Sequence, residues 1–208
     1  MLKDIDKALL NYPLLERTIV SGHYAVIGEV QLVDKTNVVF DRYNVFISFP
    51  SAYPNCFPKV KETSKKIPRK DFRHVNPDNT LCLAVEPEEL AIAKNGISFK
   101  FFLDKILVPH LARETYREIS GEYPEGEYAH GNGGIWEYYE SILGKKDRYA
   151  IINEMELILN SKWPPRYDKC SCGSEKKFKK CHHPIWLEVM KSGKNYTIEK
   201  LKQLKNER

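Results

Sequence analysis

Residues 22–33 and 38–49 carry the clearest hydrophobic pattern in the chain. Both stretches are rich in β-branched and aromatic residues, and a polar turn from Asp34 to Asn37 separates them. Such residues fit a half-buried pleated surface, and a short polar connection joins strands that run antiparallel. We therefore expect an antiparallel pair of strands here, with a third strand at residues 59–63.

Three other stretches show apolar residues at the spacing of one helix face. They are residues 4–15, 98–117 and 147–159, and Asp4 and Ser98 can cap the first two. An apolar residue at every third or fourth position places these side chains on one side of a helix, which can then cover a sheet. The sequence predicts an amphipathic helix in each stretch, and a further helix at residues 135–143.

Pro109 and His110 mark the middle of the predicted helix 98–117. A proline inside a helix removes a hydrogen-bond donor, so we expect a bend near Pro109. His110 lies on the apolar stripe of the same helix. We interpret it as a buried core histidine rather than as a catalytic base.

Prolines and glycines indicate two irregular connections. Residues 49–60 contain a proline at every fourth position, with aromatic residues and Cys56 between them, so this segment should be rigid and packed. Residues 121–134 hold five of the eleven glycines in the chain. We expect a long loop there, because glycine allows backbone conformations that other residues rarely adopt.

A polar turn leads into a cysteine near the middle of the chain. Residues 74–84 read HVNPDNTLCLA, and the run from Asn76 to Asn79 consists of turn-forming residues. The segment therefore presents Cys82 between two leucines. Free cysteines commonly pack as small apolar residues. The segment 74–84 by itself is therefore compatible with either a reactive thiol or a buried one.

The order of motifs from residue 49 to residue 83 resembles that of the ubiquitin-conjugating enzyme family. A strand ends in Phe-Pro and is followed by Tyr-Pro, Phe-Pro-x-Val, His-x-Asn and Cys-Leu. The resemblance covers roughly the first two thirds of the chain. It implies an α+β fold in which flanking helices accompany an antiparallel meander.

The same resemblance implies roles for four residues. Cys82 would carry the C-terminus of a ubiquitin-like modifier as a thioester, Asn76 would support attack by an amine, and His74 would hold the loop. Val75 stands where the family has proline, and the interval from Asn76 to Cys82 is shorter than usual, as in the bacterial branch of the family. An aromatic-x-His-Gly stretch of that branch makes His130 a candidate near the thiol.

Composition agrees with a globular protein. The 208 residues are 42% hydrophobic and 29% charged. No run approaches the roughly 18 apolar residues of a membrane span, and the first residues do not form a signal peptide, so we expect no membrane partner and a cytoplasmic location. Five cysteines in such a chain indicate thiols and metal ligands rather than disulfides.

Charge and prolines suggest a boundary late in the chain. From Ser161 onward there are 13 Lys and Arg against 5 Asp and Glu, whereas the preceding residues have 20 against 23. The two prolines after Trp163 should stop the preceding helix. We predict a catalytic domain at residues 1–145, a helical connector at 146–165 and a small zinc module at 166–208.

The predicted zinc module contains three cysteines and two histidines. Cys170 and Cys172 lie close together, and Cys181 is adjacent to His182. Once the chain turns between them, these four groups can surround a structural Zn²⁺. The stretch resembles the SEC-C zinc motif, in which His182 would be the fourth ligand, with His183 as the alternative.

Two functions of different class fit these patterns. One is a conjugating enzyme that forms a thioester with a protein substrate or a ubiquitin-like modifier through its free C-terminus. Because the sequence has no adenylation motif, a separate activating enzyme is implied. The other is an inactive module with the same fold, whose zinc tail recruits a protein, although inactive family members have generally lost the cysteine that Cys82 matches.

The resemblance also implies a biological context. Bacterial relatives of this kind occur in antiphage operons, where they act on a cyclic-oligonucleotide synthase, and that enzyme is our leading candidate acceptor. The lysines of the tail balance the charge of the zinc site and keep it solvated. A role in nucleic-acid binding has only this charge behind it and ranks last.

Overall fold

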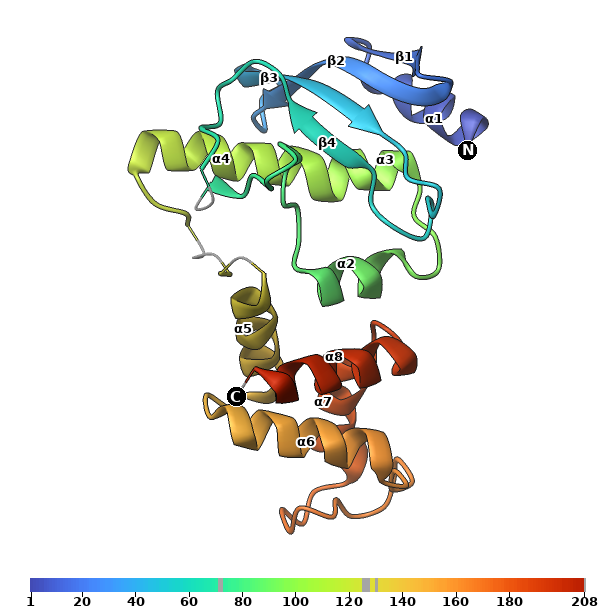
Figure 1. Cartoon of the computed structure of the whole chain (residues 1–208), viewed down its shortest axis with the longest axis vertical. Helices are drawn as coiled ribbons and strands as arrows, with labels where there is room; N and C mark the ends of the chain where they lie inside the picture. The colour runs from blue at the N-terminus through green and yellow to red at the C-terminus, as the bar shows by residue number, and fades with distance from the viewer. Residues whose placement is uncertain (71–72, 125–127, 130, 208) are drawn as a thin grey trace. The chain divides into compact units, whose positions relative to one another are not determined.

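The computed structural model describes residues 1–70, 73–124, 128–129 and 131–207 (Figure 1). Its contacts divide the chain into two compact units. The first unit comprises Met1–Ala84 and Ile92–His130, and the second comprises Val85–Ala91 and Gly131–Arg208. The second unit therefore includes a short segment that follows Cys82 closely in the sequence.

A four-stranded antiparallel sheet forms the first unit, together with helices. The strands are β1 (Leu15–Val20), β2 (His23–Val33), β3 (Val39–Ser48) and β4 (Lys59–Glu62), in the order β1-β2-β3-β4. The predicted α+β class, the antiparallel pair and the third strand are confirmed. Strand β1 was not predicted.

The start of the chain explains the missed strand. Helix α1 (Leu2–Leu9) ends before Pro13, and Leu15 already pairs with Gly28 of β2. A proline removes a backbone donor and clashes with the preceding turn of a helix. The expected helix over residues 4–15 is therefore too long, because the apolar residues after Pro13 begin a strand instead.

A long helical segment packs on the sheet. It comprises α3 (Phe99–Phe102), the π-helical turn η2 (Leu103–Leu107) and α4 (Val108–Ser120), and it crosses one face of the sheet, where α4 contacts β2 and β3 (Figure 1). The Ser98 hydroxyl accepts a hydrogen bond from the Phe101 N–H, as expected of a cap. The π turn ends two residues before Pro109, which cannot donate a backbone hydrogen bond.

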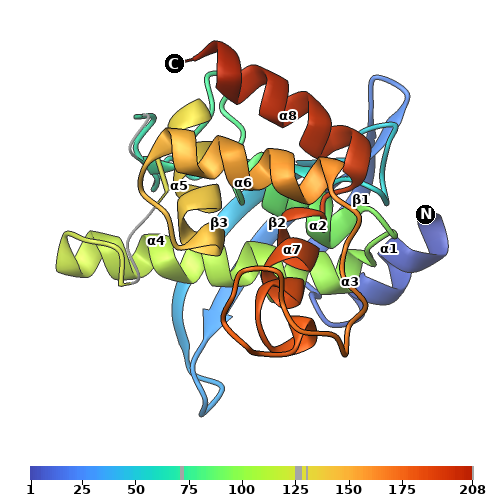
Figure 2. The same ribbon diagram turned by 90° about the horizontal axis from the view of Figure 1, so that it is seen from below.

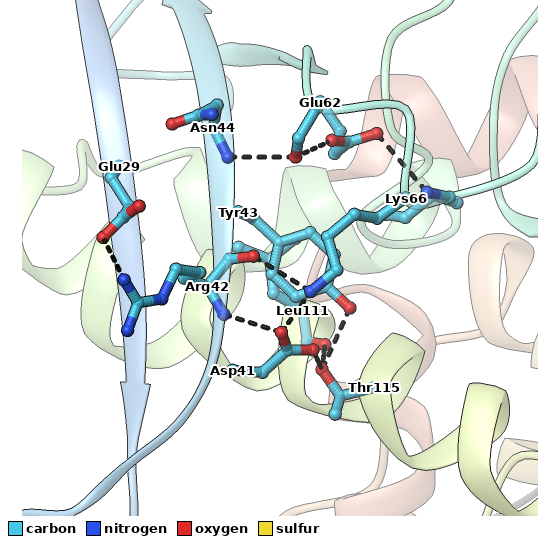
Figure 3. A network of polar contacts seen from close by, with 11 residues as sticks. Glu29, Asp41, Arg42, Tyr43, Asn44, Glu62, Lys66, Leu111 and Thr115 are labelled. Atoms are coloured by element: carbon cyan, nitrogen blue, oxygen red, sulfur yellow. Dashed lines mark hydrogen bonds and ion pairs between the residues drawn. The ribbon is translucent and has the colours of Figure 1, made fainter.

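A polar network attaches α4 to β3 (Figure 3). The Thr115 hydroxyl donates to Asp41 Oδ2 (2.6 Å), and Thr115 Oγ1 lies 2.9 Å from the Tyr43 hydroxyl. Lys66 pairs with Asp41, and its Nζ lies 4.5 Å from the centre of the Tyr43 ring. Although burial opposes ionisation, the bonds from Lys66 and Thr115 lower the pKa of Asp41. These contacts fix the long helix against the sheet.

The second unit is helical. Its main elements are α5 (Asn132–Leu143), α6 (Arg148–Asn160), the 3₁₀ turn η3 (Phe178–Lys180), α7 (His182–Val189) and α8 (Lys194–Asn206). Helices α6 and α8 lie side by side (Figure 1, Figure 2). Helix α5 covers the predicted 135–143. Helix α6 matches the predicted 147–159, and Asp147 caps it by accepting from the Ala150 N–H. The short helix α2 (Glu86–Ala93) begins in this unit.

Trp163 joins α6 to the cysteine-rich tail instead of separating them. Its indole N–H donates to the Ile158 carbonyl, and its ring lies 5.3 Å from that of Trp186. The Trp186 indole in turn donates to Glu154 of α6. The contact division thus places α5, α6 and the tail in one unit. It differs from the predicted division at 145/146 and 165/166, because side chains cross the double proline.

No helix within the described residues has the length and the apolar character that crossing a membrane requires.

We predict that Gly28→Ala destabilises the first unit by about 3 kcal/mol. Gly28 has φ +133°, and an added Cβ would lie 2.0 Å from the Leu14 carbonyl oxygen. Gly22→Ala is the matched control. Gly22 also has positive φ, but its Cβ would meet nothing within 4 Å, so we expect a loss of about 1 kcal/mol. The free energy of unfolding of both variants is measured in denaturant, with hydrogen exchange of the β2 amides as the probe. Equal losses of stability in the two variants would contradict the prediction.

Candidate functional sites: a thiol loop and a Cys3His cluster

The segment before Cys82 folds back on itself as a tight hairpin. Val75 and Leu81 form an antiparallel bridge, and the Cys82 N–H donates to the His74 carbonyl oxygen at 2.7 Å. His74 therefore lies directly opposite Cys82. Val75 and Leu81 are each 5% exposed, and the Leu81 N–H donates to the Val60 carbonyl of β4 at 2.7 Å. The hairpin is thus attached to the sheet at the residue before the thiol.

Side chains close the tip of this hairpin. The Asp78 carboxylate accepts from the Thr80 N–H (3.0 Å) and from the Thr80 hydroxyl (2.6 Å), and these bonds lower the pKa of Asp78. The Asn76 side-chain amide donates to Thr80 Oγ1 at 3.0 Å. Asn76 thus stabilises the turn, and one of its two amide protons remains for a further acceptor.

Cys82 lies where the hairpin leaves the core. The residue is half-buried, and its Sγ lies 3.9 Å from the Ala84 carbonyl oxygen. Leu83 and Ala84 pack partly against the core of the first unit. Cys56 also packs against that core, as expected of the proline-rich segment. The backbone on both sides of Cys82 is therefore held, while its side chain is partly exposed.

His74 has a rarely used backbone conformation and an aromatic environment. Its φ is +49°, in the left-handed region that a non-glycine residue adopts only when its surroundings hold it there. The ring centre lies 5.3 Å from that of Tyr123 and 6.3 Å from that of His110. The side chain therefore packs against the helical layer and the segment after α4.

His110 is a buried core histidine, as the sequence predicted. It is 8% exposed, and its Nε2 has no hydrogen-bond partner among the described residues. Burial lowers the pKa of His110 to about 3, and electrostatic interactions with His74 and Arg113 act in the same direction. His110 is neutral at physiological pH.

Sequence reasoning missed a buried ion network beside this loop. Arg73 donates to Glu114 Oε2 at 2.9 Å, and the Tyr123 hydroxyl donates to the other oxygen of Glu114. A signal for it was present in the sequence. Glu114 lies four residues after His110 on the apolar stripe of the helix, where a carboxylate is costly unless it is paired.

The structure brings together only part of the predicted catalytic set. His74 faces Cys82 across the hairpin, and Asn76 lies opposite Thr80 in the same hairpin. The fourth predicted residue, His130, lies outside the described residues.

A second group of reactive side chains lies in the second unit. The ligand atoms of Cys170, Cys172, Cys181 and His182 all lie within 4.8 Å of one another. The Cys172 and Cys181 sulfurs are 3.6 Å apart, and His182 Nδ1 is 3.3 Å from the sulfurs of both Cys170 and Cys181. A tetrahedral zinc with Zn–S bonds of about 2.3 Å has S–S edges of about 3.8 Å. The four side chains therefore fit one tetrahedral metal ion.

Local structure brings these four residues together. Lys169 and Lys177 form an antiparallel bridge, and Gly173 with φ +78° turns the chain between them. Cys181 is the N-cap of α7, and His182 is its first residue. The cysteine pair thus comes from a hairpin, and the Cys-His pair comes from a helix start. Although the Ser174 hydroxyl acts in the opposite direction, burial and the neighbouring Cys172 and Cys170 raise the pKa of Cys181.

The choice between the two histidines follows from the packing. His183 points into an aromatic cluster, 5.3 Å from the Phe178 ring and 6.2 Å from the Trp163 ring. A ring nitrogen of His182, in contrast, lies within 4.8 Å of all three cysteine sulfurs. Hydrogen bonds from the Ser174 side chain and backbone lower the pKa of Cys172 to about 6. Several thiolates this close repel one another, and a bound cation removes the repulsion.

No family model, curated protein or solved structure matched the chain. The thiol loop and the Cys3His cluster are therefore the candidate functional sites of the chain.

We predict that His110 makes the first unit sensitive to acid. In the unfolded chain its pKa is near 6.5, against about 3 in the fold. The unfolded state therefore binds more protons between these values, and stability falls as the pH falls. From pH 7 to pH 5 the loss from this residue is about 2 kcal/mol. His110→Leu should remove this part of the pH dependence of stability. Urea unfolding at each pH, with hydrogen exchange of the α4 amides as the probe, measures it.

The control for His110 is His23→Gln, which changes an exposed histidine at the start of β2. It should keep the pH dependence of the parent protein. A pH dependence in His110→Leu as steep as that of the parent would contradict the assignment.

We predict that the second unit binds one equivalent of zinc through the four residues of the cluster. His182→Gln should weaken zinc binding more than about 100-fold, since even the loss of a hydrogen-bond partner of a ligand costs 10–100-fold. His183→Gln should keep one equivalent. All three tryptophans lie in the second unit, so their fluorescence during chelation reports this unit selectively. Loss of metal from His183→Gln but not from His182→Gln would reverse the assignment.

Proposed function

We propose that the protein is a conjugating enzyme that carries the C-terminus of a modifier or partner protein as a thioester on Cys82. The observation that supports this most strongly is the hairpin around the thiol. Its backbone is tied to His74 and to β4, while Cys82 itself is half-buried at the edge of the core. A thiol that only filled the core would need neither the polar tip nor this anchoring.

The reaction consists of two acyl transfers. The Cys82 thiolate attacks the carbonyl carbon of a thioester carried by a separate activating enzyme, a new C–S bond forms, and the thiolate of the activating enzyme leaves. An amine of the acceptor then attacks the same carbon. The C–N bond forms, the Cys82 thiolate leaves, and the proton lost by the amine passes to solvent water or to the departing thiolate. Because a thioester already reacts readily with amines, the enzyme contributes mostly placement.

Two loop residues have distinct roles in this proposal. His74 holds the hairpin through its carbonyl, which accepts from the Cys82 N–H, and through its ring, which packs on Tyr123. Asn76 directs its amide to Thr80 and has a second amide proton for the tetrahedral oxyanion. Such a donor contributes on the order of 10²–10³ in rate where it has been removed elsewhere. His130 remains a candidate near the thiol.

The zinc-binding unit serves recognition in this scheme. Its four clustered side chains would supply all four ligands of a zinc ion, as in structural zinc sites. Zinc would stabilise the turn between Lys169 and Lys177 and the start of α7. The lysine-rich surface around the zinc site would select a protein partner. A cyclic-oligonucleotide synthase of an antiphage system is the leading candidate acceptor.

One observation favours a second function. The Asn76 amide is already engaged by Thr80, as expected if the loop has only a structural role. The protein would then be an inactive binding module whose zinc unit recruits a partner. The reactivity of Cys82 separates the two functions.

We predict that Cys82 forms a thiol-sensitive adduct with a polypeptide and that Cys56 does not. The protein is incubated with its activating partner, ATP and the modifier, and adducts are resolved on non-reducing gels. Cys82→Ala should abolish the adduct. Cys56→Ala is the matched control, since Cys56 packs against the core of the same unit, and it should keep the adduct at the parental level.

Two outcomes would count against the enzyme. An adduct that survives Cys82→Ala would move the acyl carrier to another residue. The absence of any adduct, with partner binding retained by Cys82→Ala, would favour the binding module.

A further inference from the structure

A buried carboxylate connects three segments of the first unit near the thiol loop. Glu114 of α4 is fully buried, and Arg73 and Tyr123 are 6% and 8% exposed. Arg73 precedes the loop, and Tyr123 follows α4. One oxygen of Glu114 accepts from the Arg73 guanidinium at 2.9 Å, and the other accepts from the Tyr123 hydroxyl. We name Arg73, Glu114 and Tyr123 the Glu114 clamp.

The clamp holds His74 from two sides. Arg73 is adjacent to His74 in the chain, so its ion pair with Glu114 fixes the backbone at that point. Tyr123 lies against the His74 ring, with 5.3 Å between the ring centres. The His74 carbonyl accepts the Cys82 N–H at 2.7 Å. A short path therefore leads from the buried carboxylate to the backbone of the thiol residue.

Two energetically unfavourable features near the loop need support from neighbouring residues. His74 has φ +49°, a conformation that persists in a non-glycine residue only where neighbours enforce it. An ionised carboxylate inside the core is also costly unless it is paired and hydrogen-bonded. The contacts of the Glu114 clamp pair the buried carboxylate and also hold His74 in its left-handed conformation. Arg117 adds to it, since its guanidinium lies 4.3 Å from the centre of the Tyr123 ring.

We propose that Arg73, Glu114 and Tyr123 are positioning residues that hold His74 in its left-handed conformation and thereby orient Cys82. The catalytic consequence rests on the proposed thioester function, whereas the effect on the geometry of Cys82 does not. Loosening the clamp should make the thiol more accessible to a small reagent, yet less well placed for acyl transfer. These two rates should therefore move in opposite directions.

The test uses the full-length zinc-bound protein with Cys56→Ala as background. Glu114→Gln keeps the shape of the side chain and removes its charge, and Tyr123→Phe keeps the ring and removes the hydroxyl. Glu16→Gln is the control for charge, because it removes an exposed carboxylate on β1 of the same unit. Tyr116→Phe changes an exposed tyrosine on α4 and is the control for the hydroxyl.

Three quantities are measured for each variant. They are the alkylation rate of Cys82 by iodoacetamide, the hydrogen exchange of the peptide that contains the Cys82 amide, and the single-turnover rate of transfer from Cys82. In Glu114→Gln and Tyr123→Phe we expect alkylation and exchange to rise at least about fivefold. Transfer should fall about 10–100-fold. The controls should change each rate less than about twofold.

The outcomes separate this inference from the proposed function. If alkylation and exchange respond but no variant, nor the parent, forms a thioester, the clamp is supported and the proposed function fails. If the parent transfers and both quantities are unchanged in folded Tyr123→Phe, the clamp is refuted. Should Glu114→Gln not fold, Tyr123→Phe and an Arg73→Lys variant, which keeps the charge, still decide the question.

Discussion

The hydrogen bond from the Cys82 N–H to the His74 carbonyl is the contact on which the thiol loop depends. It closes the hairpin at its open end, while Thr80 and Asp78 close the tip. His74, whose carbonyl accepts this bond, has a positive φ, and that conformation persists in a non-glycine residue only where its surroundings support it. The long helix and the segment after it therefore take part in shaping the loop, and the network around Tyr43 and Thr115 secures the long helix to the sheet.

Much of this arrangement follows from local patterns in the sequence. Alternating β-branched and aromatic residues give β2 and β3, and the cap at Ser98 gives the start of the long helix. The turn formers before Cys82 give the hairpin, and the spacing of Cys170, Cys172, Cys181 and His182 gives the Cys3His cluster. In each case the information lies within about fifteen residues, so propensity and spacing suffice.

The remainder depends on contacts between distant residues. Strand β1 was hidden because Leu14 and Leu15 continue the apolar spacing of α1, and only pairing with β2 makes them a strand. The Glu114 clamp joins residues that are up to fifty positions apart. The connection of α6 to the tail runs through Trp163 and Trp186, and the residues on both sides of the double proline belong to one compact unit. Periodicity along the chain carries no information about such partners.

The central claim is that Cys82 carries an acyl group. The most direct test is to express Cys82→Ser with the genes that neighbour this one and to determine the mass of the isolated protein. A hydroxyl at that position converts a labile thioester into an ester that survives purification. The account predicts a polypeptide joined through its C-terminus to residue 82 and released by mild base. An unmodified protein, or an adduct at any other residue, would contradict it.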